Sequence, residues 1–325
     1  MQTDTYANLV KLIQALIGAG TLTLDEHRHI FQFINRRLSE AYNTTQAWPR
    51  YLVSSEERIL YTILTSGLTG DDTHANSFYS FIGNDTNGNA VYKSKNTHSS
   101  HHYIFYYTIT SKKWVLIKSA TSSISISSSG VVSFTNAETL CVSDTTNDAS
   151  PLDVKLWTNS GDTTGTLATE GKLTILFDDA EGNDIGEFLR IHRKKAFLNQ
   201  SQVEYDFFLD ANGANILNVA NTNDSNAFVT YKKRLETVSI TETSPTPVVT
   251  DYTSDTSDIP LEFFYYIAHG AYADFLRIER RYEESAKEEA TAEGYLAQEL
   301  EKVDIIANNN NLKNRFSTHL NRNSR

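Results

Sequence analysis

The stretch at residues 258–307 constrains the fold of this chain more than any other part of its sequence. From residue 261 to 278, apolar side chains follow the three-to-four-residue spacing of an α-helix and occupy almost every face. Pro260 stands in the first turn, where its missing N–H costs nothing. We expect a helix buried on several sides, with Phe264 and Phe275 as anchors of a core or an interface. The main apolar positions are Leu261, Phe264, Ala268, Ala271, Phe275 and Ile278.

After Arg281 the same stretch changes from apolar to polar. Ala286, Ala290 and Gly294 lie four residues apart and form a small-residue ridge beside an acidic face. We expect two helices, or one bent helix, with the second half far more solvated than the first. No chemical motif is visible, so we interpret the stretch as a scaffold for assembly. The acidic face carries Glu283, Glu284, Glu288, Glu289 and Glu293.

Length and charge limit the classes of protein to which the chain can belong. With 325 residues it has room for about two domains and a sizeable core. The formal net charge of −11 argues against non-specific nucleic-acid binding over the whole surface, although DNA could pass through a channel without sticking. We find no signal peptide and no apolar run near the ~20 residues of a membrane span, so we expect a soluble protein.

Two helices are predicted near the N-terminus. Residues 5–17 have one apolar face, and Gly18 and Gly20 are expected to end that helix. Thr23, followed three residues later by Glu26, is the capping-box pattern that begins the second helix. We expect both helices to pack against residues 261–278 and to close one core. Their apolar faces carry Leu9, Ile13 and Leu16, and Ile30, Ile34, Leu38 and Ala41.

Two features of this region have more than one interpretation. Arg28, Arg36 and Arg37 on the second helix are interpreted as solvated, or paired with acidic neighbours, rather than as a binding patch. Trp48, beside Pro49, is interpreted as a core plug under a loop. The alternative is that Trp48 anchors an interface, because buried tryptophans dominate many interfaces.

The composition changes at about Gly67 and stays rich in Ser, Thr, Asn and Gly until about Leu176. Short β-like runs, separated by turn signals such as Asn87-Gly88, fill this segment. Strands at this spacing predict a sandwich-like or barrel-like domain inserted at residues 67–176. The predicted strands are 91–92, 103–109, 114–117, 123–127, 131–134, 154–157 and 173–177.

Beyond this segment we predict a small β element at residues 185–235 and an extended connector at 241–258. Residues 308–325 form a basic tail that is polar enough to be disordered until it binds a partner. The predicted fold is α+β: a helical bundle from both chain ends, residues 1–66 and 177–325, with a β-rich middle. The tail residues proposed as docking contacts are Phe316, His319, Arg322 and Arg325.

No catalytic or metal-binding set of residues can be assembled from the sequence. His98, His101 and His102 are clustered, but no cysteine or acidic ligand stands near them, so a polar loop is favoured over a zinc site. Asp85 opens a segment like a calcium loop that lacks the glycine and the closing glutamate of that motif. Cys141 has no adjacent base. We expect no enzyme activity, no cofactor and no metal.

Four groups of residues, spread over roughly residues 5–60 and 185–325, follow one another in a recognisable order. They are Asn35-Arg36-Arg37 with Trp48-Pro49; Tyr205 with Asp210-Ala211-Asn212-Gly213-Ala214 and Val229-Thr230-Tyr231-Lys232-Lys233; Ile259-Pro260-Leu261-Glu262-Phe263 with Ala268-His269-Gly270-Ala271; and Thr318-His319 before Arg325. In this order and spacing, the chain resembles the head-to-tail adaptor (connector or neck) proteins of tailed bacteriophages.

The resemblance implies a helical bundle built from both chain ends with a β element between them. Such adaptors assemble as a ring, commonly a dodecamer, beneath the portal, and DNA leaves the head through the central channel. Their C-terminal tail docks on the portal. The expected partners are other copies of the chain, the portal protein and tail or nozzle proteins. The expected location is the head–tail junction of the virion, after synthesis in the host bacterial cytoplasm.

Two expectations follow for the parts of such an adaptor, and one alternative function stays open. Glu284, Glu288 and Glu293 are expected to face the channel, where negative charge lowers affinity for DNA. The β-rich segment departs from the compact form of the family and is expected to project outward. The alternative function is a carbohydrate-binding, receptor-binding or decoration protein of the virion, with the aromatic strand 103–107 and Trp114 as its platform.

Overall fold

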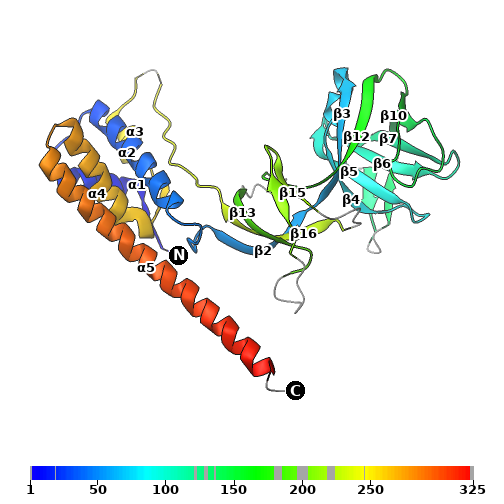
Figure 1. The fold of residues 1–325 in the computed structure, drawn as a ribbon. Helices are drawn as coiled ribbons and strands as arrows, with labels where there is room; N and C mark the ends of the chain where they lie inside the picture. The colour runs from blue at the N-terminus through cyan, green and yellow to red at the C-terminus, as the bar shows by residue number, and fades with distance from the viewer. Residues whose placement is uncertain are drawn as a thin grey trace. The chain divides into compact units, whose positions relative to one another are not determined.

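The structure is a computed structural model that describes residues 2–18, 20–120, 123–127, 131–134, 137–178, 185–195, 204–217, 224–244 and 246–322, with the backbone alone at 306–322 (Figure 1). The α+β prediction is confirmed, with a large β-rich middle. The chain divides into two compact units. Met1–Leu52 and Arg234–Arg325 form the helical unit, and Val53–Lys233 forms the β unit.

The helical unit combines helices from both parts of the chain with a short antiparallel ladder. In the ladder, Thr3 pairs with Pro260 and Thr5 with Asp258. Neither the ladder nor the short helix α3 was predicted, because segments of three to five residues show too little periodicity to be recognised. The elements are β1 (Thr3–Thr5), α1 (Tyr6–Ile17), α2 (Leu24–Asn43), α3 (Val249–Thr253), β17 (Asp258–Pro260), α4 (Leu261–Ile278) and α5 (Tyr282–Arg322).

The predicted helix boundaries near the N-terminus are confirmed. Gly18 ends α1 in the left-handed conformation, with φ of 74°, which costs a glycine little. Thr23 caps α2: its hydroxyl accepts from the backbone N–H of Glu26, and its own N–H donates to the Glu26 carboxylate at 2.6 Å. Both ends of the α1–α2 connection are therefore determined by local sequence.

One hydrophobic core is shared by α1, α2, α4 and α5, and α4 contributes the most side chains to it. Phe264 and Phe275 lie in this core, as the spacing predicted. The prediction was wrong at Ile278, which is 55% exposed. Ile278 is the last residue of α4, and the chain turns away directly after it, with Arg280 at φ of 65°.

This turn makes α4 and α5 separate helices, one of the two predicted alternatives. The small-residue ridge of Ala286, Ala290 and Gly294 lies on the exposed side of α5. The prediction of a disordered segment at residues 308–325 differs from the structure, in which α5 continues to Arg322. No glycine or proline follows Gly294 in the sequence, and extending a formed helix costs little. The α5 side chains in the core are Ala292, Leu296 and Val303.

In the described part of the β unit, the largest sheet has ten antiparallel strands in the order β11-β10-β7-β6-β5-β4-β3-β12-β15-β14. It does not close into a barrel through a continuous ladder. A smaller sheet has the order β13-β16-β2, and β8 and β9 form a hairpin. The strands are β2 (Leu52–Ile59), β3 (Tyr61–Thr69), β4 (Phe78–Asn84), β5 (Ala90–His98), β6 (His101–Thr108), β7 (Lys113–Ala120), β8 (Ile124–Ile126), β9 (Val132–Phe134), β10 (Glu138–Ser143), β11 (Trp157–Asn159), β12 (Thr164–Leu176), β13 (Ile185–His192), β14 (Phe207–Leu209), β15 (Gly213–Ile216) and β16 (Asn226–Lys233).

The β unit extends beyond the inserted domain predicted at residues 67–176 on both sides. The ladder between β3 and β12 begins before residue 67, because Tyr61 pairs with Thr174. Strands β15 and β14, which follow residue 176, belong to the same large sheet. The β element predicted at residues 185–235 therefore lies with the β unit up to Lys233 rather than with the helices.

Candidate functional site

A buried charged network joins three helices of the helical unit. Arg37 on α2 is only 4% exposed, and Asp274 on α4 is 3% exposed. The Arg37 guanidinium donates to both Asp274 oxygens at 2.9 Å and to both Glu289 oxygens, on α5, at 2.6 Å. Burial lowers the pKa of Arg37, but the bonds to Glu289 and Asp274 outweigh it and raise that pKa above its ordinary value. The network fixes the relative placement of α2, α4 and α5.

Gly270 of α4 makes room for this arginine. A Cβ atom built on Gly270 would lie 2.9 Å from Arg37 Nε and 3.0 Å from its Cδ. A methyl group there would therefore push the guanidinium away from its partners. The sequence predicted that Arg28, Arg36 and Arg37 would be solvated or paired. All three are paired, but the burial of Arg37 was not predicted.

Trp48 lies in the core of the helical unit, as the core-plug interpretation predicted. Its indole N–H donates to the Ala41 carbonyl at 3.0 Å, and its ring meets Phe263 edge to face at a centroid distance of 4.8 Å. With Phe264 and Phe275 also buried, these candidate anchors stabilise the chain's own core rather than presenting an exposed contact.

The acidic residues proposed to face a channel do not lie on one face of α5. At about 100° per residue, Glu293 projects roughly 180° away from Glu284. Glu284 pairs with Arg281, and Glu288 Oε2 lies 2.8 Å from Nδ1 of His269 on α4. Glu293 is exposed and has no ion-pair partner among the described side chains. At most two of the three glutamates can therefore point toward a common surface.

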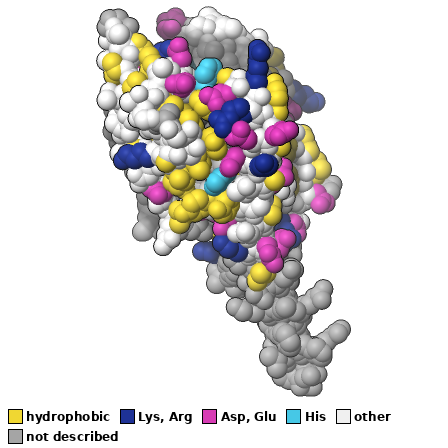
Figure 2. All heavy atoms as spheres, turned by 90° about the vertical axis from the view of Figure 1, so that its left-hand side faces the viewer, with side chains coloured by type: hydrophobic (Ala, Val, Ile, Leu, Met, Phe, Trp, Pro, Cys, Tyr) yellow, Lys and Arg dark blue, Asp and Glu magenta, His cyan; other side chains and the backbone are white. Residues whose placement is uncertain are grey.

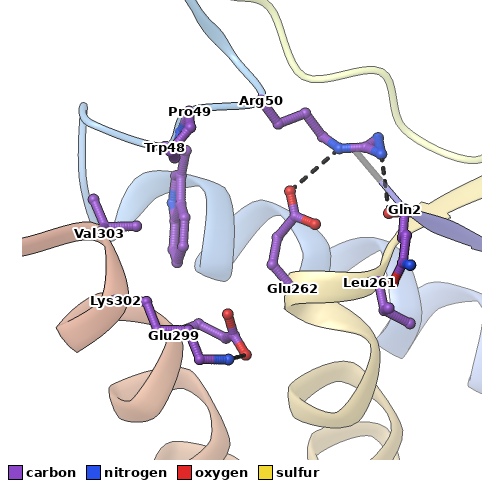
Figure 3. Close-up of a pocket in the computed structure, with 9 residues that line it drawn as sticks. All are labelled: Gln2, Trp48, Pro49, Arg50, Leu261, Glu262, Glu299, Lys302 and Val303. Carbon is purple, nitrogen blue, oxygen red and sulfur yellow. Dashed lines mark hydrogen bonds and ion pairs between the residues drawn. The ribbon is translucent and has the colours of Figure 1, made fainter. Parts of the chain in front are cut away.

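A pocket of about 360 Å³ lies between the start of α4, the Trp48 loop and α5 (Figure 3). The Trp48 indole stands between Val303 and Glu262, with Glu299 and Lys302 below it in the view. Arg50 Nε lies 3.2 Å from the Glu262 carboxylate, and Lys302 Nζ lies 2.5 Å from that of Glu299. We call this the Trp48 pocket. It is lined by Gln2, Trp48, Pro49, Arg50, Leu261, Glu262, Glu299, Lys302 and Val303.

At the other end of α4, the turn into α5 exposes apolar side chains. Ile278 is 55% exposed and Tyr282 is 66% exposed, with Arg280 between them. We call these three residues the apolar turn. Elsewhere on α4 and α5, Tyr265 stacks with Tyr295 at 5.4 Å between ring centroids. Figure 2, which views the helical end of the molecule, shows hydrophobic side chains interspersed with acidic and basic ones.

The candidate chemistry in the β unit is confined to buried or self-satisfied groups. Cys141 is buried in β10, and burial raises its pKa to about 12, so its thiol is unreactive. Asp85 accepts backbone N–H bonds from Asn87 and Asn89 at 2.8 and 2.9 Å in the turn that joins β4 to β5. The Asp85 carboxylate therefore stabilises the turn rather than binding an ion.

The three clustered histidines do not form a polar loop: His98 ends β5, and His101 and His102 begin β6. The His98 ring stacks on that of His74 at 3.8 Å. Across the described residues, no group of three or more His, Cys, Asp and Glu side chains is placed to hold a metal ion. Of the side chains proposed as an aromatic platform, those of Tyr103 and Trp114 are buried in the β unit's own core.

The side chains proposed to dock on a portal lie outside the described side chains. Phe316, His319 and Arg322 belong to the part of α5 described by its backbone alone, and Arg325 lies outside the described residues. None of the described helices is long and apolar enough to cross a membrane. Comparisons with protein-family models, curated proteins and solved structures found no match to this chain.

Proposed function

We propose that this protein is a head-to-tail adaptor of a tailed bacteriophage, which forms a ring between the portal and the tail and lets DNA pass through its centre. The observation that carries the proposal is the length of α5. This helix has 41 residues and packs on α4, which has 18, so its backbone extends well past the helix it packs on (Figure 1). A helical stretch that extends past its packing partner is marginal in water, and in this proposal another molecule covers it.

Within this proposal, the helices from both chain ends form the bundle that occupies the ring. The Arg37–Asp274–Glu289 network supports that role, because it fixes α5 rigidly to α2 and α4. A ring needs each copy to present the same geometry to its neighbours. The β unit projects from the ring and contacts neighbouring virion proteins. No catalytic residue, metal or cofactor is assigned.

In this proposal, acidic residues of α5 face the channel and the C-terminal tail binds the portal protein. The net charge of −11 supports weak affinity for DNA, so that DNA slides through the ring. Glu284 and Glu288 are the pair that α5 can present together toward the channel, with Glu293 on another face. Residues 308–325, with Phe316, His319, Arg322 and Arg325, dock on the portal protein. The ring is located at the head–tail junction of the virion and contacts tail or nozzle proteins on its other side.

The test is assembly of the purified chain, alone and with portal-bearing heads, followed by electron microscopy and mass measurement. We expect a ring of about a dozen copies that binds the heads, in the size range of closed homo-oligomers. Removing residues 312–325 should abolish attachment to the heads while leaving the ring intact. Replacing Lys313, Arg315 and Arg322 with glutamine is the matched control for charge alone. A chain that never binds heads, or a truncated chain that attaches normally, would contradict the proposal.

A further inference from the structure

Helix α3 covers a buried histidine of α2, and we infer that this part of the chain is a pH-sensitive latch that opens on acidification. His27 is the group that binds the proton, and residues 248–257, which include α3, are the segment that is released from α1 and α2. We call residues 248–257 the latch segment. All of these residues belong to the helical unit, so the latch does not depend on the adaptor proposal.

His27 lies in a position that disfavours its charged form. It is only 2% exposed, and its Nδ1 atom has no hydrogen-bond partner among the described residues. The protonated ring would carry an N–H at Nδ1 that meets no acceptor and no bulk water, so the charge is costly while the latch segment is in place. Burial accordingly lowers the pKa of His27, against a smaller opposing effect of Glu26.

Tyr252 of α3 covers His27. The two rings stack with 6.5 Å between their centroids, and Tyr252 is 4% exposed. The Tyr252 ring also meets Phe31 edge to face at 6.0 Å, and Phe31 meets Tyr6 of α1 at 6.4 Å. Because α3 has only five residues, it is unstable as a helix without such packing. Loss of the Tyr252 contact would therefore release the whole of α3.

Anchored positions on both sides limit the segment that can move. Before the latch segment, the Asn35 side chain exchanges two hydrogen bonds with the backbone of Val238, both at 3.0 Å. After it, β17 pairs with β1. The latch segment itself is held to α1 by the Tyr6 N–H, which donates to the Ser257 carbonyl at 2.9 Å. Water can replace such a bond at little net cost, so the segment can leave while its flanks stay in place.

The direction of the pH effect follows from the change in solvation of His27. Once the latch segment is released, the ring reaches water and recovers the ordinary histidine pKa of about 6.5. The closed state binds the proton less readily, so a fall in pH below about 6.5 favours the released state until the lower pKa of the closed state is reached. One proton is linked to opening. The released population should therefore rise by at most about tenfold per pH unit.

The other described groups that face His27 and its neighbouring rings are not expected to titrate in the same range of pH. Between pH 5 and pH 8, carboxylates ordinarily stay ionised and tyrosines stay neutral. Burial and the bond to Glu242 raise the pKa of Tyr252, while bonds from Arg28 and Tyr252 lower the pKa of Glu242. The facing groups are Glu26 and Arg28 of α2, Tyr6 of α1, Tyr252 of α3, and Glu242 and Asp255 of the connector.

Hydrogen–deuterium exchange of the full chain between pH 8 and pH 5 tests the latch, with each rate divided by the intrinsic rate at that pH to give a protection factor. In the natural chain, the protection of the latch segment should fall by about threefold to tenfold between pH 6.5 and pH 5.5, while that of α4 is retained. His27→Phe keeps a ring against Tyr252 but binds no proton, so its latch segment should keep constant protection. His27→Gln also lacks a titrating ring and should give the same constant profile.

The matched control is His29→Gln, which removes an exposed histidine two residues further along α2. Its profile should follow that of the natural chain. Constant protection of the latch segment in the natural chain would overturn the latch, as would equal falls in the natural chain and the His27 variants. A fall in the protection of α4 together with that of the latch segment would also overturn it, because the whole helical unit would then be opening.

Discussion

The helical unit and the β unit bury polar groups in different ways. In the helical unit, Arg37 is satisfied by Asp274 and Glu289, carboxylates more than 200 positions further along the chain. In the β unit, the buried Arg58 pairs with the carboxylate of Glu56, two residues away, and donates to the Tyr231 hydroxyl on the neighbouring strand β16. One lost charge in the helical unit should therefore affect both chain ends, whereas loss of the Glu56 charge should act on one sheet of the β unit.

The largest expected effect comes from Asp274→Ala, which leaves the buried Arg37 without one of the two carboxylates that accept its hydrogen bonds. We expect the helical unit to lose about 3–5 kcal/mol of unfolding free energy. Urea unfolding followed by helix-sensitive circular dichroism measures this loss, while the β unit should keep its own transition. Glu284→Ala, which removes an exposed pair with Arg281, is the control and should cost about 0–1 kcal/mol. Equal losses in the two variants would contradict the argument that the buried network stabilises the helical unit more than an exposed pair does.

A smaller effect is expected from Gly270→Ala. The new methyl group would overlap Arg37 and should cost about 1–3 kcal/mol, as other overpacked sites do. Gly294→Ala on α5 is the matched control, because a Cβ atom there meets nothing within 4 Å. That control should gain up to about 1 kcal/mol through helix propensity. Thermal unfolding of both variants would show opposite shifts of the melting temperature, and shifts of the same sign would exclude the steric argument.

The smallest effect concerns a single turn of the β unit. Asp210 accepts from Lys172 Nζ at 2.6 Å and from the N–H groups of Asn212 and Gly213, and these bonds hold its pKa well below the ordinary value. A carboxylate of this kind stabilises fully above its unfolded pKa of about 4 and loses that contribution as the pH falls toward the lower folded pKa.

Replacing Asp210 with asparagine should cost about 1 kcal/mol at neutral pH, a typical value for lost hydrogen bonds. The stability of the variant should also fall less steeply than that of the natural chain between about pH 4 and pH 2. Urea unfolding at a series of pH values, followed by a strand-sensitive signal, measures both. Parallel pH profiles would show that this turn does not contribute through Asp210.

Much of the helical unit could be predicted because its signals are local. The capping box at Thr23 and the glycine at Gly18 act within a few residues, and the burial of residues 261–278 follows from apolar spacing. The Arg37 network could not be predicted, since nothing near Arg37 in sequence indicates carboxylates on other helices. The exposure of Ile278 depends on the turn at Arg280, where φ is positive. A positive φ cannot be predicted from the sequence at a residue other than glycine.

The boundaries of the β unit could not be predicted either, because they depend on pairing between distant segments. Most strands were visible as short runs, but the pairing of Tyr61 with Thr174 and of Ile175 with Ala214 joins segments that composition alone would divide. The sequence therefore placed the boundary at the change in composition, near residues 67 and 176. The structure places it where ladder pairing ends, at Leu52 and Lys233. The position of Glu293 opposite Glu284, by contrast, follows from helical spacing alone and could have been predicted from the sequence.

The ladder between Thr3–Thr5 and Asp258–Pro260 has a consequence for synthesis on the ribosome. Helices α1 and α2 are translated more than 200 residues before their packing partner α4. At 5–20 residues per second, this delay is on the order of tens of seconds. The β unit can complete its hairpins during that interval, while the apolar faces of α1 and α2 remain uncovered. During this interval the nascent chain is therefore vulnerable to aggregation and chaperone capture through the apolar faces of α1 and α2.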